Sequence, residues 1–548
     1  MQKRLNVFFS RYEFLIPLLL FLFFLAAALP GIRWGAPALW NPDELVWRVD
    51  KALAGDLKFD VTEPDYNYPS LPKYVMYLIG SITYGLGRSA YTFIVAARSF
   101  SAFLGGLAAV LIYVLARTVG GRKRVALLAG LLYIASAEAV TNGRFAHNDL
   151  YLQFFTILCV IFVIRYQATA GLRWLYLSFL AVGFAASCKY TGGSLILLPI
   201  VAYLSVTWKE LRSRWLEMAV RLLLGGLVAY IGYGLGTPIA FVDPIHYFSN
   251  VLSALRNLTN YGFNAGTRLG LYGQWSIFES AVGVFCYYMF LGGYAWFALR
   301  WLLERFGIRL SPLAMPASVG VFLGVVLIFD LPFLISINYI GRYFIPFIPF
   351  MAILSAFLVE DVLRFASDRK LGLVHPAVAT LLVLGLGYSA LRLVSISLLF
   401  LNDARIPATE YIAGIRGYQK SIEYTLYPPA IEKKRFMRAH NYPIYFVEWA
   451  GDQVPTGGRI EYNLGEQGLL ERDTDYFVID SFTYDRFYTQ SICDTTPVEC
   501  DFFKHLIADE VQTYRLLEDF KYELPPYLPK VGLTAVNPEV RIYERVRE

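Results

Sequence analysis

Long apolar runs separated by short polar connections dominate residues 1–400 of the chain. The first run is EFLIPLLLFLFFLAAALPG, which begins at Glu13. Runs of about 18 or more mostly apolar residues are long enough to cross a bilayer as a helix. Further runs lie near residues 94–116, 125–141, 150–165, 174–188, 191–206, 219–238, 276–299, 313–332, 343–359 and 376–400. The pattern predicts a polytopic α-helical membrane protein with about eleven transmembrane helices.

Basic residues indicate which connections face the cytoplasm. They cluster ahead of the first run and then on every second connection, at Arg117, Arg122, Lys123 and Arg124, Arg165 and Arg173, Lys209, Arg212, Arg214 and Arg221, Arg300, Arg305 and Arg309, and Arg364, Arg369 and Lys370. Because cytoplasmic loops are enriched in Lys and Arg, the N-terminus is expected in the cytoplasm. An odd number of spans then places the C-terminus outside. A cleaved signal peptide would also suit the first run, but the many later spans favour an uncleaved helix.

The apolar stretch Leu71–Gly87 does not fit this alternation of sides. Counted as a span, it would move the cluster at Arg117–Arg124 to the outside. We therefore expect a juxtamembrane or re-entrant helix at the outer surface, within an outer loop of residues 31–93.

The composition changes at about Leu401. Strand-like pieces such as YPIYFVEW and YFVIDSF are followed by the helical pattern ECDFFKHLIADEVQTYRLLEDF. We expect residues 1–400 to form a transmembrane domain and residues 401–548 to form an extracytoplasmic α+β domain.

The overall composition agrees with a membrane protein. The chain is 56% hydrophobic and only 17% charged. Its net charge of +6 reflects topology, because no basic patch with interleaved aromatic residues indicates nucleic-acid binding. Cys493 and Cys500 are seven residues apart in the outer domain, so a disulfide between them is open, and no zinc-type spacing occurs.

Charged residues gather at the outer ends of the predicted spans, where ionisable groups are often functional. They are Arg98, Glu138, Arg144, His147, Asp149, Lys189, Glu279, Asp330, Arg342 and Arg392. Each also has a structural explanation, such as an arginine that snorkels to the interface or a carboxylate that caps a helix. Asp149 and Lys189 stand beside small or turn-forming residues, which favours a pocket at this face.

Two adjacent carboxylates, Asp43 and Glu44, follow the first span on the same side. Their sequence NPDE suits a helix start, with Asn41 as N-cap, Pro42 in the first turn and Glu44 completing a capping box. A carboxylate can also accept a proton from an attacking hydroxyl or amine, while lysine and arginine stabilise a phosphate leaving group. Together these residues predict group transfer from a lipid-linked phosphate donor on the outer face.

Six motifs resemble, in chain order, those of glycosyltransferase family 39. They are NPDELVWRVDKALAGD, YPSLPKY, AARSFSAFLGGLAAVLIYVLAR, NGRFAHNDLYLQFF, AASCKYTGG and GRYFIPFIPFMAILSA. The family includes the dolichyl-phosphate-mannose protein mannosyltransferases and the bacterial aminoarabinose transferases that act on lipid A. The resemblance implies a GT-C fold and inverting transfer of a hexose or pentose from a polyprenyl-phosphate carrier, without metal or cofactor.

The resemblance also implies roles for single residues. Asp43 matches the general base or acceptor-orienting group, with Glu44 beside it and Asp149 in the same catalytic site. The positions expected to bind the donor phosphate or support the pocket are Arg98, His147, Lys189, Arg342 and Tyr343. Many bacterial relatives have a lysine before two prolines where this chain has Tyr68, Pro69 and Ser70, so Lys73 is the candidate substitute.

Two other functions stay open at the level of sequence. A transporter or flippase for a lipid-linked glycan would also place charges in its spans, although such proteins often have an inverted repeat, which this chain lacks. An oligosaccharyltransferase would carry a tryptophan-rich signature in its outer domain, which is missing. The expected location is a prokaryotic plasma membrane, with membrane lipids, the donor and a protein, lipid or glycan acceptor as partners.

Overall fold

The computed structural model describes residues 13–48, 68–260, 270–308, 318–334, 340–442, 465–494 and 496–547. These residues form two compact units. The first contains the described parts of residues 1–32, 43–257 and 269–394, and the second those of residues 33–42, 258–268 and 395–548. The loop that precedes Asp43 therefore belongs to the same unit as the C-terminal domain.

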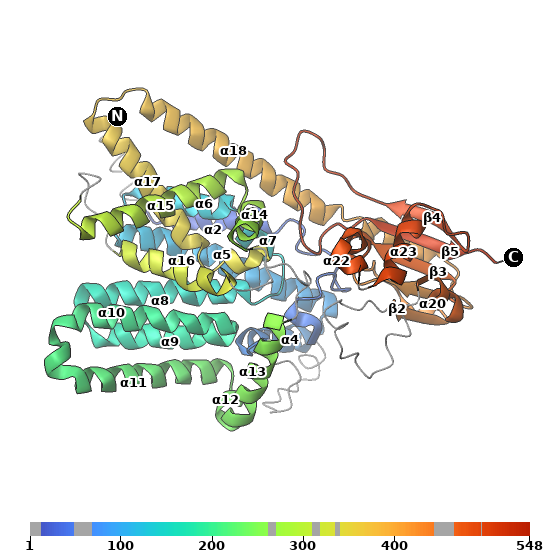
Figure 1. Ribbon diagram of the computed structural model, residues 1–548, viewed down its shortest axis with the longest axis horizontal. Coiled ribbons are helices and arrows are strands. Elements are labelled where there is room, and N and C mark those ends of the chain that lie inside the picture. Colours follow the sequence, from blue (N-terminus) through green and yellow to red (C-terminus); the bar gives the residue numbers. More distant parts are fainter. Residues whose placement is uncertain are drawn as a thin grey trace. The chain divides into compact units, whose positions relative to one another are not determined.

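The first unit is helical (Figure 1). Its longer helices are α2 (Leu15–Ala28), α4 (Leu71–Gly85), α5 (Ala90–Thr118), α6 (Lys123–Ala135), α8 (Asp149–Thr169), α9 (Leu172–Cys188), α10 (Leu197–Thr207), α11 (Leu211–Gly236), α13 (Pro244–Asn260), α14 (Gly270–Val282), α15 (Val284–Arg305), α16 (Val319–Leu334), α17 (Ile348–Asp368) and α18 (Val374–Leu401). Short elements between them are η1 (Leu45–Arg48), α7 (Glu138–Asn142), η2 (Tyr190–Ile196), η3 (Trp208–Glu210), α12 (Ile239–Val242) and η4 (Gly341–Phe344).

Each predicted span coincides with a helix or with a pair of consecutive helices. Among the described residues, five helices are individually long and apolar enough to cross a membrane, and a bent pair would make six. The helices Leu15–Ala28 and Leu172–Cys188 and the segment Val319–Leu331 are apolar but shorter. The chain is thus an integral membrane protein, while eleven crossings remain a prediction.

One predicted span, at residues 276–299, is divided in the structure. Helices α14 and α15 meet at Gly283 with a bend of 119° between Gln274–Val282 and Val284–Arg305. Gly283 has a φ of 81°, a conformation that glycine adopts without the steric penalty of a side chain. An added Cβ there would lie 3.1 Å from Cδ of Arg392. The hydrophobic pattern runs through this break, so it gave no sign of the bend.

Several helices of the first unit pack side by side around α8 and α9. Helix α8 packs against α5, α9 and α10, and α9 also packs against α11 (Figure 1). Gly183 of α9 allows this close approach, because a Cβ there would lie 2.1 Å from the carbonyl oxygen of Ala229 in α11. The N-terminus of α8 and the C-terminus of α9 are positioned by this packing, and η4 is positioned by contacts with α7 and α14.

The second unit contains a five-stranded sheet with the order β2-β1-β3-β5-β4. The strands are β1 (Ser421–Tyr424), β2 (Arg438–Asn441), β3 (Tyr476–Asp480), β4 (Tyr514–Phe520) and β5 (Val540–Arg545). Strand β1 is parallel to β2 and β3, whereas β5 is antiparallel to β3 and β4. The registers include Ile422 opposite Tyr476 and Phe477 opposite Tyr543.

Helices and further short elements connect these strands. They are α19 (Arg405–Gly414), η5 (Lys433–Arg435), α20 (Gly465–Glu471), α21 (Ser481–Tyr484), η8 (Asp485–Tyr488), α22 (Gln490–Cys493) and α23 (Pro497–Ile507). Side chains of β3 alternate between two cores: Phe477 packs with Phe503 of α23, and Val478 packs with Ile412 of α19. The expected α+β character of this region is confirmed, and Cys493 forms a disulfide with Cys500.

The helix predicted over residues 499–520 is wrong in its second half. Helix α23 ends at Ile507, and residues 514–520 form strand β4. Pairing with β5 decides this, because tertiary contacts override the helical preference of Leu and Glu. The predicted strand YPIYFVEW lies outside the described residues, apart from Tyr442.

Candidate active site

Asp43 and Glu44 lie in a turn ahead of the short helix η1, not within its first turn. The interpretation of NPDE as a capping box is therefore wrong. The carboxylate of Glu44 faces Arg98 of α5 instead of the backbone of Asn41. The two adjacent carboxylates therefore have different surroundings.

Glu44 forms a fully buried, two-pronged ion pair with Arg98. Its carboxylate oxygens lie 2.8 Å and 3.1 Å from Nη2 and Nε of Arg98. Arg98 also donates to the carbonyl of Ile32, and the backbone N–H of Leu45 donates to the carbonyl of Ala146. Both charged side chains have 0% exposure. This arrangement binds the turn to α5 and to the connection before α8, and it keeps Arg98 away from solvent.

Asp43 lies at the start of a connected series of charges. Its Oδ2 is 2.9 Å from Nη2 of Arg342 in η4, and Nε of the same arginine is 3.9 Å from Oδ2 of Asp149. The other oxygen of Asp149 accepts a hydrogen bond of 2.8 Å from Lys189, and Nδ1 of His147 is 2.6 Å from Oδ2. Asp149 is fully buried, whereas the Asp43 side chain is 45% exposed. Five predicted site residues from four separate segments thus lie together.

Local structure explains how these side chains reach one another. Asp149 is the first residue of α8, where its negative charge also complements the helix dipole. Lys189 follows the last residue of α9 in an extended conformation. Asn148 donates a 2.9 Å hydrogen bond to the carbonyl of Cys188, which joins the start of α8 to the end of α9. This hydrogen bond is not predictable from the sequence, because asparagine at a helix start usually caps its own helix.

Electrostatics favour an ionised Asp43 and a neutral His147. Burial would raise the pKa of Asp43, but Arg342 and His147 outweigh it and hold that pKa below its usual value of 3.8. Burial, with Arg342 nearby, lowers the pKa of His147 below 6.5 despite the opposing charge of Asp149. A neutral His147 donates from Nδ1 to Asp149, which leaves Nε2 as an acceptor. This Nε2 is buried and has no hydrogen-bond partner among the described residues.

Aromatic rings enclose the charges. Nζ of Lys189 lies 4.4 Å from the ring centre of Tyr343, at cation–π distance. The ring of Tyr68 packs edge-on against His147 at 5.6 Å. Sequence reasoning treated Tyr68 only as a departure from the family motif, so this contact was missed. Its position before Pro69, in a turn close in sequence to the carboxylates, was the available signal.

The remaining predicted charged residues form other contacts. Arg144 donates to the carbonyls of Ala27 and Pro30 at the end of α2, which is a structural role. Glu138 accepts a hydrogen bond from Asn142 and packs against Gly341, directly before Arg342. Arg392 binds the carbonyls of residues 280 and 281, and Asp330 accepts from the side chain of residue 274.

No three His, Cys, Asp or Glu side chains are grouped as metal ligands in the described part of the chain. The cluster contains the partly exposed carboxylate of Asp43 and the pair of cations Lys189 and Arg342. Such an arrangement can hold an anionic group and accept a proton beside it.

Comparison with known proteins places this geometry in context. Residues 58–241 match the family model of dolichyl-phosphate-mannose-protein mannosyltransferases. This match includes Arg98, His147, Asp149 and Lys189. No curated protein matches the chain.

Several solved structures are similar to this chain. The archaeal oligosaccharyltransferase AglB from Archaeoglobus fulgidus, in complex with an inhibitory peptide and a dolichol-phosphate, is 12% identical with a TM-score of 0.53, covering 98% of this chain and 89% of AglB. A second structure of the A. fulgidus oligosaccharyltransferase, tethered with an acceptor peptide, is 12% identical with a TM-score of 0.52, over 91% of this chain and 72% of that one. ArnT from Cupriavidus metallidurans is 13% identical with a TM-score of 0.48, over 99% and 98%.

The chain is a membrane glycosyltransferase, and its residues 58–241 resemble the GT39 mannosyltransferases. Similarity to AglB confirms the expected GT-C fold, and the mannosyltransferase family model confirms the resemblance seen in the motifs.

Proposed function

We propose that this glycosyltransferase moves a sugar, with inversion, from a polyprenyl-phosphate carrier to an acceptor on the extracytoplasmic face of a prokaryotic plasma membrane. The observation that carries the proposal is the joint placement of Asp43, Arg342, Asp149 and Lys189. A base and two cations are the minimum needed to attack an anomeric carbon and release a phosphate.

The cations suit the carrier phosphate. Lys189 and Arg342 share the buried Asp149, which orients both of them, and Arg342 also pairs with Asp43. Stabilisation of a phosphate oxyanion by such fixed donors is a large contribution to catalysis. AglB binds dolichol-phosphate, and the matching family model is named for dolichyl-phosphate mannose, which supports a polyprenyl carrier here.

In the proposed step, Asp43 accepts the proton of an acceptor hydroxyl or amine. The freed electron pair attacks the anomeric carbon from the face opposite the phosphate. The bond from that carbon to the phosphate oxygen breaks, and polyprenyl phosphate leaves with the electron pair. One displacement inverts the anomeric configuration, and the phosphate needs little protonation to leave, so neither a metal ion nor a second acid is required.

Arg342 would connect donor binding to the strength of the base. In the structure it pairs with Asp43, which keeps the pKa of that carboxyl low and makes it a weak base. A bound phosphate would compete for the guanidinium and loosen this pair. The pKa of Asp43 would then rise toward its usual value when the donor is present.

The topology supports the assignment of side. The basic clusters on alternate connections support a location of Asp43, Asp149 and Lys189 away from the cytoplasm. The N-terminus would then be cytoplasmic and the C-terminal domain extracytoplasmic.

Incubation of the purified chain in proteoliposomes with radiolabelled polyprenyl-phosphate sugars tests the function. We expect release of free polyprenyl phosphate together with loss of label from the lipid. An intact donor that merely changes leaflet would identify a flippase and overturn the proposal.

A further inference from the structure

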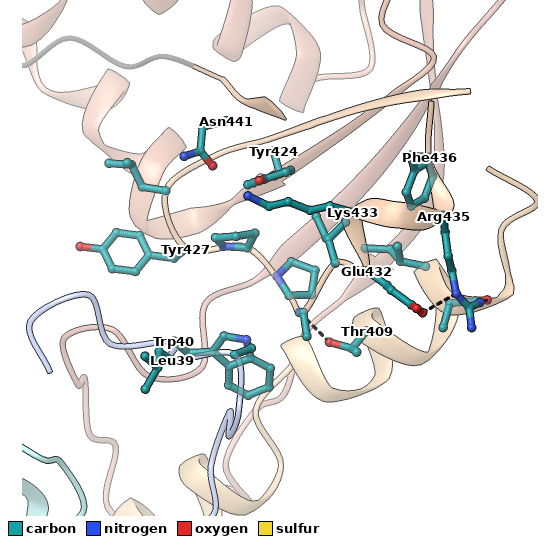
Figure 2. A pocket seen from close by; sticks show the side chains of 18 of the residues that line it. Leu39, Trp40, Thr409, Tyr424, Tyr427, Glu432, Lys433, Arg435, Phe436 and Asn441 are labelled. Atoms are coloured by element: carbon teal, nitrogen blue, oxygen red, sulfur yellow. Dashed lines mark hydrogen bonds and ion pairs between the residues drawn. The ribbon is translucent and has the colours of Figure 1, made fainter. Parts of the chain in front are cut away.

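A cavity of about 590 Å³ lies within the second unit (Figure 2). This volume is typical of sites for small molecules. Trp40 contributes to one side of the cavity, and Tyr424 and Lys433 lie on the other side in Figure 2. Prolines and aliphatic side chains complete the walls.

The cavity lies where parallel strands end. Tyr424 is the last residue of β1 and Asn441 is the last residue of β2, and both line it. Ligands of open α/β sheets bind outside the carboxyl ends of the strands. The loop after β1, which forms one wall, is fixed because Asp480 at the end of β3 accepts from the backbone N–H of Tyr427 and from the Thr425 hydroxyl.

The Trp40 side chain is held rigidly in place. The guanidinium of Arg405 stacks at 4.5 Å from its ring centre, and Gly35 leaves room for the ring, since a Cβ there would lie 2.7 Å from Cδ2 of Trp40. Arg405 is itself fully buried and paired with Asp403. Trp40 is 7% exposed, and its indole N–H has no hydrogen-bond acceptor among the described residues. A rigid aromatic side chain in the wall of a cavity is suited to packing against the apolar face of a ligand.

The two cationic side chains that line the cavity, Arg435 and Lys433, differ in their partners. Arg435 is already bound to Glu432 at 2.5 Å and to the carbonyl of Ala413. Lys433 lies 5.9 Å from the ring centre of Tyr424 and forms no ion pair within the described ranges. Lys433 therefore offers a single positive charge beside an aromatic ring.

We propose that this cavity binds one sugar unit and prefers a sugar with a carboxylate. A sugar ring has apolar C–H faces that pack on aromatic rings and hydroxyl groups around its edge that hydrogen-bond. A lipid chain would make no use of the amide of Asn441 or the ammonium of Lys433, which line the cavity and are exposed. A phosphate would require several free cations, and here only Lys433 is uncommitted.

The inference rests on the proposed function, because it identifies the acceptor as a glycan. The lining segment 38–42 is joined directly to Asp43 in the sequence. The transmembrane unit would then hold the donor, and the second unit would recognise the acceptor.

Saturation-transfer NMR of the full chain in nanodiscs tests the inference. The probes are the methyl glycosides of glucose, galactose, mannose and glucuronic acid, together with N-acetylglucosamine and an acidic hexapeptide. We expect transfer to the sugar ring protons, with glucuronide binding about tenfold tighter than glucoside, as is typical for a hydrogen bond to a charged group. Binding of none of the sugars, or of the peptide alone, would overturn the proposal.

Three variants locate the binding. Lys433→Gln should remove the preference for glucuronide, while Lys434→Gln, next to it but outside the lining, should leave the preference unchanged. Trp40→Phe keeps an aromatic ring but a smaller one, so it should weaken the binding of every sugar. Sugar binding that Lys433→Gln and Trp40→Phe both leave at the wild-type level would place the site elsewhere.

Release of polyprenyl phosphate is measured on the same preparation. Donor cleavage without sugar binding would refute this inference alone, and sugar binding without donor cleavage would refute the proposed function.

Discussion

Arg342 lies 2.9 Å from Asp43 and connects it to the buried Asp149. The arginine thus contacts both the candidate base and the anchor of the candidate phosphate site. Replacement by glutamine should weaken donor binding and lower turnover together, because both depend on this guanidinium. Lysine should restore donor binding better than turnover, since it keeps the charge but loses the fork that orients Asp43. Donor affinity and initial rate of Arg342→Gln and Arg342→Lys measure this, and wild-type donor affinity in Arg342→Gln would contradict it.

Lys189 should act mainly on the donor. Its ammonium binds Asp149 at 2.8 Å and lies over Tyr343. Lys189→Ala should weaken donor affinity about tenfold, as expected when a charged hydrogen-bond donor is lost. Lys189→Arg is the matched control that keeps the charge. Titration with a fluorescent polyprenyl phosphate measures the affinity, and equal affinities for Lys189→Ala and wild type would remove Lys189 from the phosphate site.

The buried pair of Glu44 and Arg98 should matter for stability. Removal of one partner leaves an uncompensated buried charge, which costs about 3–5 kcal/mol. Glu44→Met should therefore lower the melting temperature strongly, and the double variant Glu44→Met with Arg98→Met should regain part of the loss. Thermal unfolding in detergent checks this. A double variant less stable than both single variants would show that the pair is not coupled in this way.

Activity should resist mild acid. The pKa of Asp43 is held below 3.8 by Arg342 and His147, so the carboxylate stays ionised as the pH falls. The pKa of His147 is lowered below 6.5, so this side chain is mostly neutral at pH 6.5. The rate at saturating donor should then show no acidic limb at pH 6.5, provided the bound donor raises the pKa of Asp43 no further than its usual value. A half-maximal rate at or above pH 6.5 in a pH–rate profile would contradict this assignment.

Arg405 should stabilise the second unit. It is fully buried between the rings of Trp34 and Trp40, at 5.0 Å and 4.5 Å, and it pairs with Asp403 at 2.8 Å. Arg405→Leu should cost about 3–5 kcal/mol, because Asp403 would remain charged and buried. Arg515→Leu is the control, since its pair with Glu544 is largely exposed and contributes ~0–1 kcal/mol. Similar melting temperatures for the two variants would contradict the structural role of Arg405.

Hydrophobic pattern and charge position predicted much of this molecule. The apolar runs coincide with helices because a membrane helix must be apolar along most of its length. The gathering of Asp149 and Lys189 was also predictable, since both stand at helix ends on one expected face. The bend at Gly283 was not, because isolated glycines are common within membrane helices.

The sequence also did not predict which residues pair when they are far apart in the chain. Glu44 and Arg98 are 54 positions apart, and the local sequence NPDE suggested a capping box instead. Residues 514–520 formed a strand because β5 lies beside them, which their own pattern does not encode. The cavity is lined by Trp40 and Tyr424, which are far apart in the sequence, so the sequence alone does not predict it.

Turnover and donor binding of Asp43→Asn, measured on one preparation, test the central claim most directly. The substitution removes the proton acceptor and leaves Arg342, Lys189 and Asp149 in place. Loss of a general base typically lowers the rate about 100-fold or more, so we predict transfer below about one hundredth of wild type with donor still bound. Retention of more than about a tenth of wild-type transfer would contradict the assignment of Asp43 as the base.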